Sequence, residues 1–187
     1  MAVNSFMVPL GTPAPSFDLT AIDGGSVSLT DLKGSPATLV VFLSNHCPYV
    51  RRIEKGLAAL ATDYGSRLSI VAICSNDSVH YPDDDATHLA EQAARAGFTF
   101  PYLLDETQEV AKAYKAACTP DFFLYDSSFA LVYRGEFDDA RPGNDVPVTG
   151  ASLRTAVDAV LAGDPVDSPQ NPSLGCGIKW KPGNAPA

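Results

Sequence analysis

The residues of this chain best suited to chemistry are four cysteines: Cys47, Cys74, Cys118 and Cys176. No two of them form a Cys-x-x-Cys pair, and the three histidines show no metal-ligand spacing. In a chain of 187 residues, this number of cysteines does not indicate a small domain held together by disulfides. Each cysteine is therefore predicted to be either a buried apolar residue or a redox-active thiol.

Cys47 lies between an apolar run and a predicted amphipathic helix. Residues 37–43, ATLVVFL, have the continuous apolar character of a strand buried on both faces, and a helix is predicted from about 48 to 63. Pro48 suits the first helical turn, because its missing N–H would be unpaired there anyway. A thiolate at Cys47 would face the free N–H groups of that turn and the positive end of the helix dipole. The sequence therefore predicts that Cys47 attacks peroxides or disulfides.

The elements that must position Cys47 follow an alternating order. Residues 16–32 read as two short strands joined by a Gly-Gly turn. Further strands are predicted at 37–43, 68–74, 100–105, 121–126 and 130–137, and helices at about 48–63, 84–96, 107–116 and 151–162. The order predicts an α/β fold, in which a mixed β-sheet is flanked by helices and preceded by an N-terminal β-hairpin extension.

The C-terminal tail, residues 164–187, is rich in Pro, Gly, Asn and Ser, and it is predicted to be irregular. It nevertheless contains LGCGIKW, with the only tryptophan of the chain. The apolar side chains of Ile178 and Trp180 would give this tail a reason to dock. We therefore predict one domain, residues 8–163, with the tail docked on it.

A second motif, ACTPDFFLYD at residues 117–126, places Thr119 and Pro120 just before a predicted strand. With this motif, the chain resembles the thioredoxin fold over about residues 8–180, in the peroxiredoxin-like branch of alkyl hydroperoxide reductase and thiol-specific antioxidant proteins. SNHCPYVRR, CTPDFFLYD and GCGIKW together resemble an uncharacterised redoxin subgroup. The resemblance implies that Cys47 is the reactive cysteine. It also implies that a cis Thr119–Pro120 bond faces Cys47 and shapes the substrate site.

The chain departs from the patterns of both related groups. Ser44 matches the hydroxyl position of peroxiredoxins, where it would hydrogen-bond near the sulfur, but Val40 replaces their usual proline. The arginine that usually precedes the later strand is missing near Thr119–Pro120. Three arginines are candidates to replace it: Arg51, Arg52 and Arg134. Val50 occupies the second cysteine position of the thioredoxin motif.

The partner of Cys47 is left open between two cysteines. Cys118 lies two residues before Pro120, in the loop that by resemblance faces the reactive thiol, and Cys176 lies in the tail. A partner needs its Cα within about 7 Å of the Cα of Cys47. A one-cysteine mechanism, with neither as partner, is the third possibility. Cys74, at the end of a predicted strand, is expected to be a packing residue.

These features predict a thiol-dependent oxidoreductase that reduces peroxides through Cys47, with Cys118 or Cys176 resolving the oxidised form. The alternatives are a disulfide reductase or isomerase without peroxidase activity, and a redox-sensing or metal-binding module. A thioredoxin-type or small-thiol reductant would supply electrons, and no bound cofactor is implied. The net charge of −9 argues against nucleic acid and anionic membranes as partners. The sequence gives no oligomeric state.

Two further expectations concern the cellular location of the protein and the environment of its acidic runs. The N-terminus has no basic and apolar leader, and no apolar run is long enough to cross a bilayer. A cytoplasmic protein is therefore expected. Much of the acidity lies in DDD at residues 83–85 and DD at 138–139, which are expected to be solvated loops.

Overall fold

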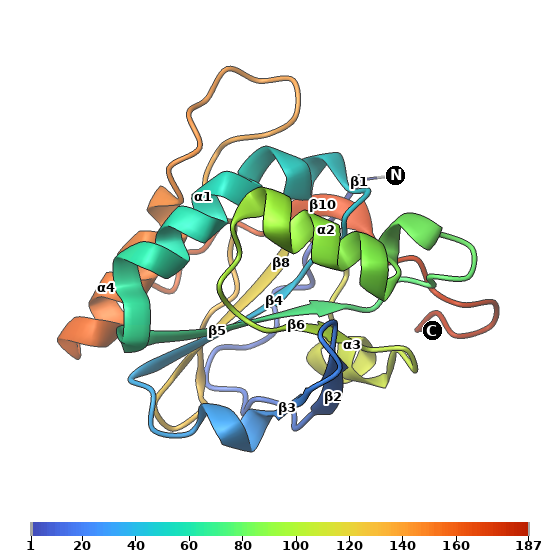
Figure 1. The fold of residues 1–187 in the computed structure, drawn as a ribbon. Coiled ribbons are helices and arrows are strands. Elements are labelled where there is room, and N and C mark those ends of the chain that lie inside the picture. The colour runs from blue at the N-terminus through green and yellow to red at the C-terminus, as the bar shows by residue number, and fades with distance from the viewer. Residues whose placement is uncertain (1, 187) are drawn as a thin grey trace.

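The computed structural model describes residues 2–186, and its centre is a seven-stranded mixed sheet (Figure 1). The strand order is β3-β2-β6-β5-β4-β8-β9. Their bounds are β2 Asp18–Ala21, β3 Ser26–Ser28, β4 Ala37–Phe42, β5 Leu68–Cys74, β6 Tyr102–Leu104, β8 Asp121–Asp126 and β9 Leu131–Tyr133. Strands β4, β5 and β6 are parallel, whereas β8 runs antiparallel to β4. The predicted α/β class with an N-terminal hairpin is confirmed.

Helices cover both faces of this sheet (Figure 1). The α-helices are α1 Pro48–Tyr64, α2 Ala86–Ala96, α3 Glu109–Tyr114 and α4 Ala151–Ala162, and the short 3₁₀ helices are η1 Leu29–Leu32, η2 Gly65–Arg67 and η3 Pro82–Asp84. Helices α1, α2 and α4 pack on one face, and α3 and η1 pack on the other. Two apolar layers result, one on each side of the sheet.

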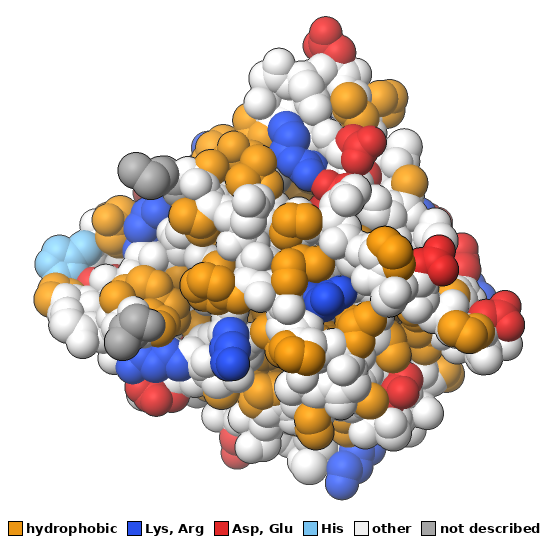
Figure 2. Space-filling model, turned by 180° about the vertical axis from the view of Figure 1, so that it is seen from behind, with side chains coloured by type: hydrophobic (Ala, Val, Ile, Leu, Met, Phe, Trp, Pro, Cys, Tyr) orange, Lys and Arg blue, Asp and Glu red, His pale blue; other side chains and the backbone are white. Residues whose placement is uncertain are grey.

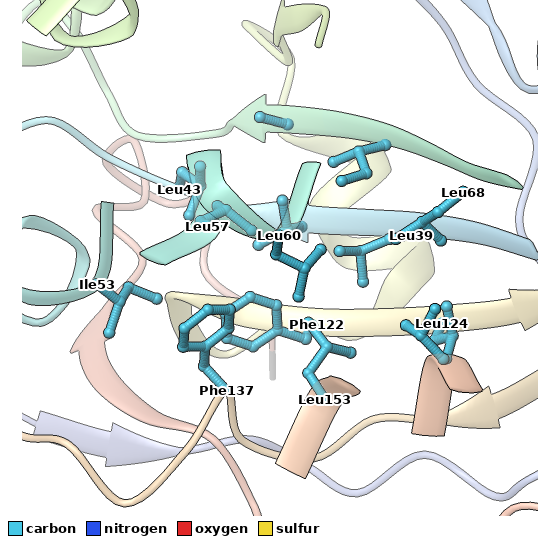
Figure 3. Packing of buried hydrophobic residues seen from close by; sticks show 14 of the residues in the cluster. Leu39, Leu43, Ile53, Leu57, Leu60, Leu68, Phe122, Leu124, Phe137 and Leu153 are labelled. Carbon is cyan, nitrogen blue, oxygen red and sulfur yellow. The ribbon is translucent and has the colours of Figure 1, made fainter. Parts of the chain in front are cut away.

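The central strand β4 divides its side chains between these two layers. Leu39 and Val41 belong to the layer under α1 and α4, and Val40 and Phe42 belong to the layer under α3. This is the alternation that a strand buried on both faces requires. Figure 3 shows the first layer, where side chains of α1 and Leu153 of α4 meet those of the sheet. Because both faces are covered, the end of β4 is held firmly, and that end leads into Cys47.

A second, three-stranded sheet has the order β1-β10-β7, with β1 Ala2–Asn4, β7 Cys118–Thr119 and β10 Leu174–Gly177. Both contacts of β10 are antiparallel, so the C-terminal tail is inserted between the N-terminus and the strand before Pro120. In Figure 1, β1 and β10 lie beside the N-terminal end of α1. The expectation that the tail is irregular is therefore wrong for residues 174–177, where pairing with β7 imposes a strand.

The tail continues along the domain after β10. Ile178 is buried, Trp180 packs against the layer under α3, and the backbone N–H of Lys179 donates to the Asn76 side chain at 2.8 Å. Asp77 in turn donates its N–H to the carbonyl of Lys179 at 2.8 Å. Docking thus uses both apolar burial and backbone hydrogen bonds.

The acidic runs are not simply solvated loops. Asp84 and Asp138 are 1% and 3% exposed. Asp84 accepts a hydrogen bond from the backbone N–H of Asn45, and Asp138 accepts one from the backbone N–H of Thr149. A buried carboxylate needs such donors. On the side seen in Figure 2, hydrophobic side chains are interspersed with lysine and arginine, and acidic side chains lie mostly toward the rim. Within residues 2–186, no helix has the length and apolar character to cross a membrane.

Candidate active site

Cys47 lies at the start of α1, directly after the loop that follows β4. Its backbone is extended, with φ −75° and ψ 120°, and it is the N-cap residue, with Pro48 in the first turn. The thiol makes no capping hydrogen bond; Sγ instead donates to the carbonyl oxygen of Thr119 at 3.0 Å. The side chain is completely buried. The reactive-thiol candidate is thus enclosed, and it points at the strand that precedes Pro120.

Asp84 holds the loop that presents Cys47. Its carboxylate accepts from the Asn45 N–H at 2.7 Å and the Asn76 side-chain amide at 2.7 Å, and it lies 2.6 Å from His46 Nδ1. Burial opposes ionisation, but the hydrogen bonds from His46 and Asn76 hold the pKa of Asp84 below its usual value. Nothing in the run DDD distinguishes this residue, because its donors come from distant parts of the chain.

The three arginines that were candidates to polarise a peroxide make other hydrogen bonds. Arg51 Nε donates to the carbonyl of Asn45 at 2.7 Å, so it braces the same loop. The guanidinium of Arg52 donates to the carbonyl of Val146 at 2.9 Å, and that of Arg134 donates to Val8 at 2.7 Å. Among the described residues, no hydrogen bond joins the guanidinium of any of the three to the Cys47 thiol; the one bond to Cys47 is from the backbone N–H of Arg51 to its carbonyl, at 3.0 Å, within the first turn of α1.

The Thr119–Pro120 peptide bond is cis, as the resemblance implies. Thr119 is buried, and its hydroxyl lies 3.2 Å from the hydroxyl of Ser44, which is also buried. The carbonyl oxygen of Thr119 accepts from Cys47. The structure therefore brings Ser44, Cys47, Thr119 and Pro120 together, with the Ser44 hydroxyl bonded to Thr119.

Cys176 joins this group through the tail. It is paired with Thr119 across the β10–β7 ladder, so the side chains of the two residues lie on the same face of the small sheet. Its thiol lies close enough to that of Cys47 for the two to influence each other's ionisation. Burial, and then the neighbouring Cys47, raise the pKa of Cys176 to about 11, whereas Lys179 opposes the rise. Unlike Cys47, Cys176 is partly exposed.

Cys118 is close in sequence but differently placed. It is paired with Gly177, one position along from the Thr119–Cys176 pair, and successive strand residues point to opposite faces. Its thiol donates to the carbonyl of Pro120 at 3.4 Å and is fully buried. Burial, and next the Asp121 carboxylate, raise the pKa of Cys118 far above that of a free thiol. Cys118 is thus a shielded thiol beside the site.

Asp121 is the buried carboxyl on the Cys118 side. It accepts from the Ala117 N–H at 2.9 Å and is fully enclosed. Burial raises the pKa of Asp121 to about 7 despite that hydrogen bond. A polar residue at the start of a strand carries no signal in the sequence that it will be buried, so the environment of Asp121 is visible only in the structure.

A model of the AhpC/TSA family matches residues 10–134, a span that includes Cys47 and Thr119–Pro120. This match covers well over half of the chain. The chain belongs to the AhpC/TSA family. As a member, it is a thiol-dependent oxidoreductase with a thioredoxin-like, peroxiredoxin-like fold.

Two solved structures are similar to nearly the whole of this AhpC/TSA family member. An uncharacterized conserved protein from Geobacillus kaustophilus is 53% identical, with 97% of each chain covered and a TM-score of 0.94. A hypothetical protein from Sinorhizobium meliloti 1021 is 52% identical, covers 96% of this chain and 99% of its own, and also has a TM-score of 0.94. Both matches extend over nearly the full length.

A more distant structure shares the fold. A putative thiol:disulfide interchange protein DsbE from Chlorobium tepidum is 19% identical, with a TM-score of 0.66, over 82% of this chain and 99% of its own. The likeness confirms the thioredoxin-like arrangement of this AhpC/TSA member. A search of curated proteins found no match.

The remaining candidates of this AhpC/TSA member make contacts of other kinds. Cys74 ends β5, is buried, and has a pKa raised by burial and then by Asp84. This buried position agrees with the prediction that Cys74 is a packing residue. Within residues 2–186, no group of three or more His, Cys, Asp or Glu side chains is arranged to hold a metal ion. The imidazole of His46 faces Asp84.

Proposed function

We propose that this protein is a dithiol–disulfide oxidoreductase in which Cys47 and Cys176 alternate between two thiols and one disulfide. The observation that carries the proposal is the pairing of Cys176 with Thr119, whose carbonyl accepts from the Cys47 thiol. The tail strand thereby supplies the second cysteine that is missing after Cys47. Cys118 is not assigned this role, because it lies on the other face of β7.

The redox cycle needs two electrons and two protons. When the pair reduces a substrate disulfide, the substrate S–S bond breaks, a Cys47–Cys176 S–S bond forms, and the substrate leaves as two thiols. A thioredoxin-type or small-thiol reductant then returns the pair to the dithiol. Such recycling suits the cytoplasm, which is the location that we propose.

Peroxide reduction is the second candidate, and the AhpC/TSA family match favours it. Cys47 would attack the peroxide O–O bond, releasing an alcohol or water and becoming a sulfenic acid. Cys176 would then displace water from that sulfur to form the same disulfide. Within residues 2–186, the guanidinium groups of Arg51, Arg52 and Arg134 bond to backbone carbonyls and not to the Cys47 thiol, and we place this candidate second for that reason.

The test measures two activities with dithiothreitol as reductant: reduction of insulin disulfides and consumption of hydrogen peroxide. We expect insulin reduction by the wild type, reduced to background in Cys47→Ser, with Cys74→Ala as a matched control that keeps the wild-type rate. Peroxide turnover without insulin reduction would select the second candidate. Equal rates for wild type and Cys47→Ser in both assays would overturn the enzymatic role of Cys47.

A separate measurement addresses the pair itself. Protein treated with oxidised glutathione is digested without reduction and its linked peptides are mapped. We expect a link between the peptides that contain Cys47 and Cys176. A link from Cys47 to Cys118 would show that Cys118, and not Cys176, is the disulfide partner of Cys47.

A further inference from the structure

Lys179, in the tail just after β10, brings a positive charge to the proposed pair of thiols. Burial raises the pKa of Cys176, and the ammonium group of Lys179 opposes that rise, so it lies close enough to act on charge at this sulfur. Nζ of Lys179 donates to the carbonyl of Gly177 at 2.9 Å, which directs the side chain back along the tail. Both Lys179 and Cys176 are partly exposed. A molecule from solvent can therefore contact this cation.

Tyr81 holds the ammonium group from the side of the loop that precedes α2. Nζ of Lys179 lies 5.8 Å from the centre of the Tyr81 ring, which is within the range of a cation–π contact. The same ring stacks on the imidazole of His46, with the ring centres 5.6 Å apart and the planes 17° apart. His46 directly precedes Cys47. Tyr81 thus connects the neighbour of Cys47 with the cation beside Cys176.

The backbone of Lys179 is fixed independently of its side chain. Its N–H donates to the Asn76 side chain at 2.8 Å, and its carbonyl accepts from the Asp77 N–H at 2.8 Å and from the Gln108 side chain at 3.0 Å. Figure 1 shows the loop between β5 and α2 and the tail after β10 at the same end of the molecule. The ammonium group therefore extends from a rigid base toward a fixed ring.

The carboxylates of this region are occupied by donors other than Lys179. Asp77 accepts from the Val79 N–H at 3.1 Å and lies 2.6 Å from His80, and Asp84 lies 2.6 Å from His46. Within residues 2–186, no carboxylate forms an ion pair with Lys179. An ammonium group has three N–H donors, and one backbone carbonyl uses only one of them. The cation is therefore able to bind an anionic ligand.

The charge of the whole chain makes this local cation significant. The net charge is −9, so the overall field of the protein disfavours the approach of anions. A cation held beside the thiols acts in the opposite direction over a short range, where screening by salt is weakest. Lys179 is thus placed to select a substrate by the charge near its sulfur atoms.

We propose that Lys179 determines substrate specificity by binding a carboxylate that the disulfide substrate carries close to its S–S bond, with Tyr81 as a positioning residue for the ammonium group. The inference rests on the proposed Cys47–Cys176 function and names the class of its substrate. In the reaction, the substrate S–S bond breaks and two carboxylate-bearing thiols leave. The two protein thiols lose two hydrogens and form one disulfide.

The experiment compares three small disulfides with the same two-methylene arm: dithiodipropionate, which is anionic, hydroxyethyl disulfide, which is neutral, and cystamine, which is cationic. Reduced full-length protein is mixed with an excess of each, quenched in acid, and followed by intact mass as the loss of two hydrogens. The quantity of interest is the rate with dithiodipropionate divided by that with hydroxyethyl disulfide. Comparing this ratio between variants cancels both the intrinsic reactivity of the disulfides and any general change in the reactivity of Cys176.

We expect Lys179→Met to lower the ratio about fivefold, the upper range for an ion pair at a partly exposed site. Lys179→Arg should keep the wild-type ratio because it keeps the charge. Lys33→Met is the matched control, since it removes the same charge from the exposed turn after η1 and should leave the ratio unchanged. Tyr81→Leu should lower the ratio about twofold through loss of the cation–π contact. The rate with cystamine, relative to hydroxyethyl disulfide, should rise in Lys179→Met.

Two results would contradict these statements in different ways. A ratio that Lys179→Met leaves unchanged would overturn the inference, even if all three rates fell together, because a uniform fall reports only on the thiols. It would leave the proposed function intact. If none of the three disulfides produced the Cys47–Cys176 link in the wild type, the proposed function itself would be overturned.

Discussion

Cys118 and Cys176 lie on adjacent strands, one position apart in the ladder, yet their surroundings differ in every respect that matters for redox chemistry. Cys176 is opposite Thr119, its ionisation is affected by the neighbouring Cys47, and it is partly exposed. Cys118 is fully buried and bonded to the carbonyl of Pro120. Side chains alternate between the two faces of a strand, and this alternation places the two thiols in different surroundings. Sequence distance from Pro120 does not decide which of them faces Cys47.

Strand β7 thus has a candidate redox side and a structural side. On the candidate redox side, the Cys47 thiol donates to the Thr119 carbonyl, the hydroxyls of Ser44 and Thr119 lie 3.2 Å apart, and Cys176 is paired with Thr119. On the structural side, the Cys118 thiol lies near the buried carboxyl of Asp121, and both groups are held in their neutral forms more strongly than in water.

The largest difference is expected when each cysteine is removed in turn. Cys176→Ala should abolish the intramolecular disulfide of Cys47, because Cys118 points to the other face of β7 and Cys74 lies at the end of β5. Cys118→Ala should retain it. Intact-mass analysis after treatment with oxidised glutathione measures this as a loss of two hydrogens, which we expect in wild type and Cys118→Ala. In Cys176→Ala we expect no such loss. If Cys176→Ala lost two hydrogens and Cys118→Ala did not, Cys118 would be the disulfide partner of Cys47 and Cys176 would not.

The second prediction concerns the pH dependence of stability on the structural side. Burial raises the pKa of Asp121 from 3.8 to about 7, so the folded state binds more protons than the unfolded state between these values. The contribution of Asp121 to stability is therefore present at low pH and falls as pH rises toward 7. The change amounts to at most about 4 kcal/mol.

Asp121→Asn tests this prediction because an amide does not titrate in this range and its oxygen can still accept from Ala117. Urea unfolding at several pH values from 4 to 8 should show the variant gaining stability relative to the wild type as pH rises, and a constant difference above the pKa. Disulfide formation between Cys47 and Cys176 should be unchanged. A difference that is independent of pH would mean that Asp121 is not the titrating group.

Much of the main sheet was predictable from the sequence because its signals are local. The apolar runs at 37–43 and 68–74 are strands almost over the same residues, since burial on both faces requires continuous apolar character. Strand β10 was not predictable in this way. Its residues Leu174–Gly177 contain two glycines, and the strand exists because β1 and β7 pair with it.

The candidate site shows the same limit. Cys47 and the cis Thr119–Pro120 bond could be identified, the first from its place before a helix and the second from family resemblance. The choice between Cys118 and Cys176 could not be made, because it depends on long-range strand register. The role of Asp84 depends likewise on donors some 40 residues earlier in the chain.

The third prediction tests how closely β10 must approach β7. A Cβ on Gly175 would collide with the backbone carbonyl of Thr119, whereas a Cβ on Gly177 would make ordinary contacts with the Val3 side chain at 3.6 Å and the Ala117 carbonyl at 3.9 Å. We expect Gly175→Ala to cost about 1–3 kcal/mol of stability, as overpacking does, and to slow formation of the Cys47–Cys176 disulfide. Gly177→Ala is the matched control. Equal effects of the two substitutions on disulfide formation would show that close approach at Thr119 is not needed.

The smallest effect is expected at Ser44, and it separates a structural hydroxyl from a catalytic one. The Ser44 hydroxyl lies 3.2 Å from that of Thr119. Ser44→Ala should therefore cost about 1 kcal/mol of stability, the usual contribution of one such bond. Thr119→Val removes the other partner, and the double variant should cost less than the sum of the two, since the shared bond is lost only once. Chemical denaturation of all four proteins gives this coupling energy. If Ser44→Ala slowed the reaction of Cys47 with disulfide strongly while Thr119→Val did not, the hydroxyl would act on the sulfur itself rather than through Thr119.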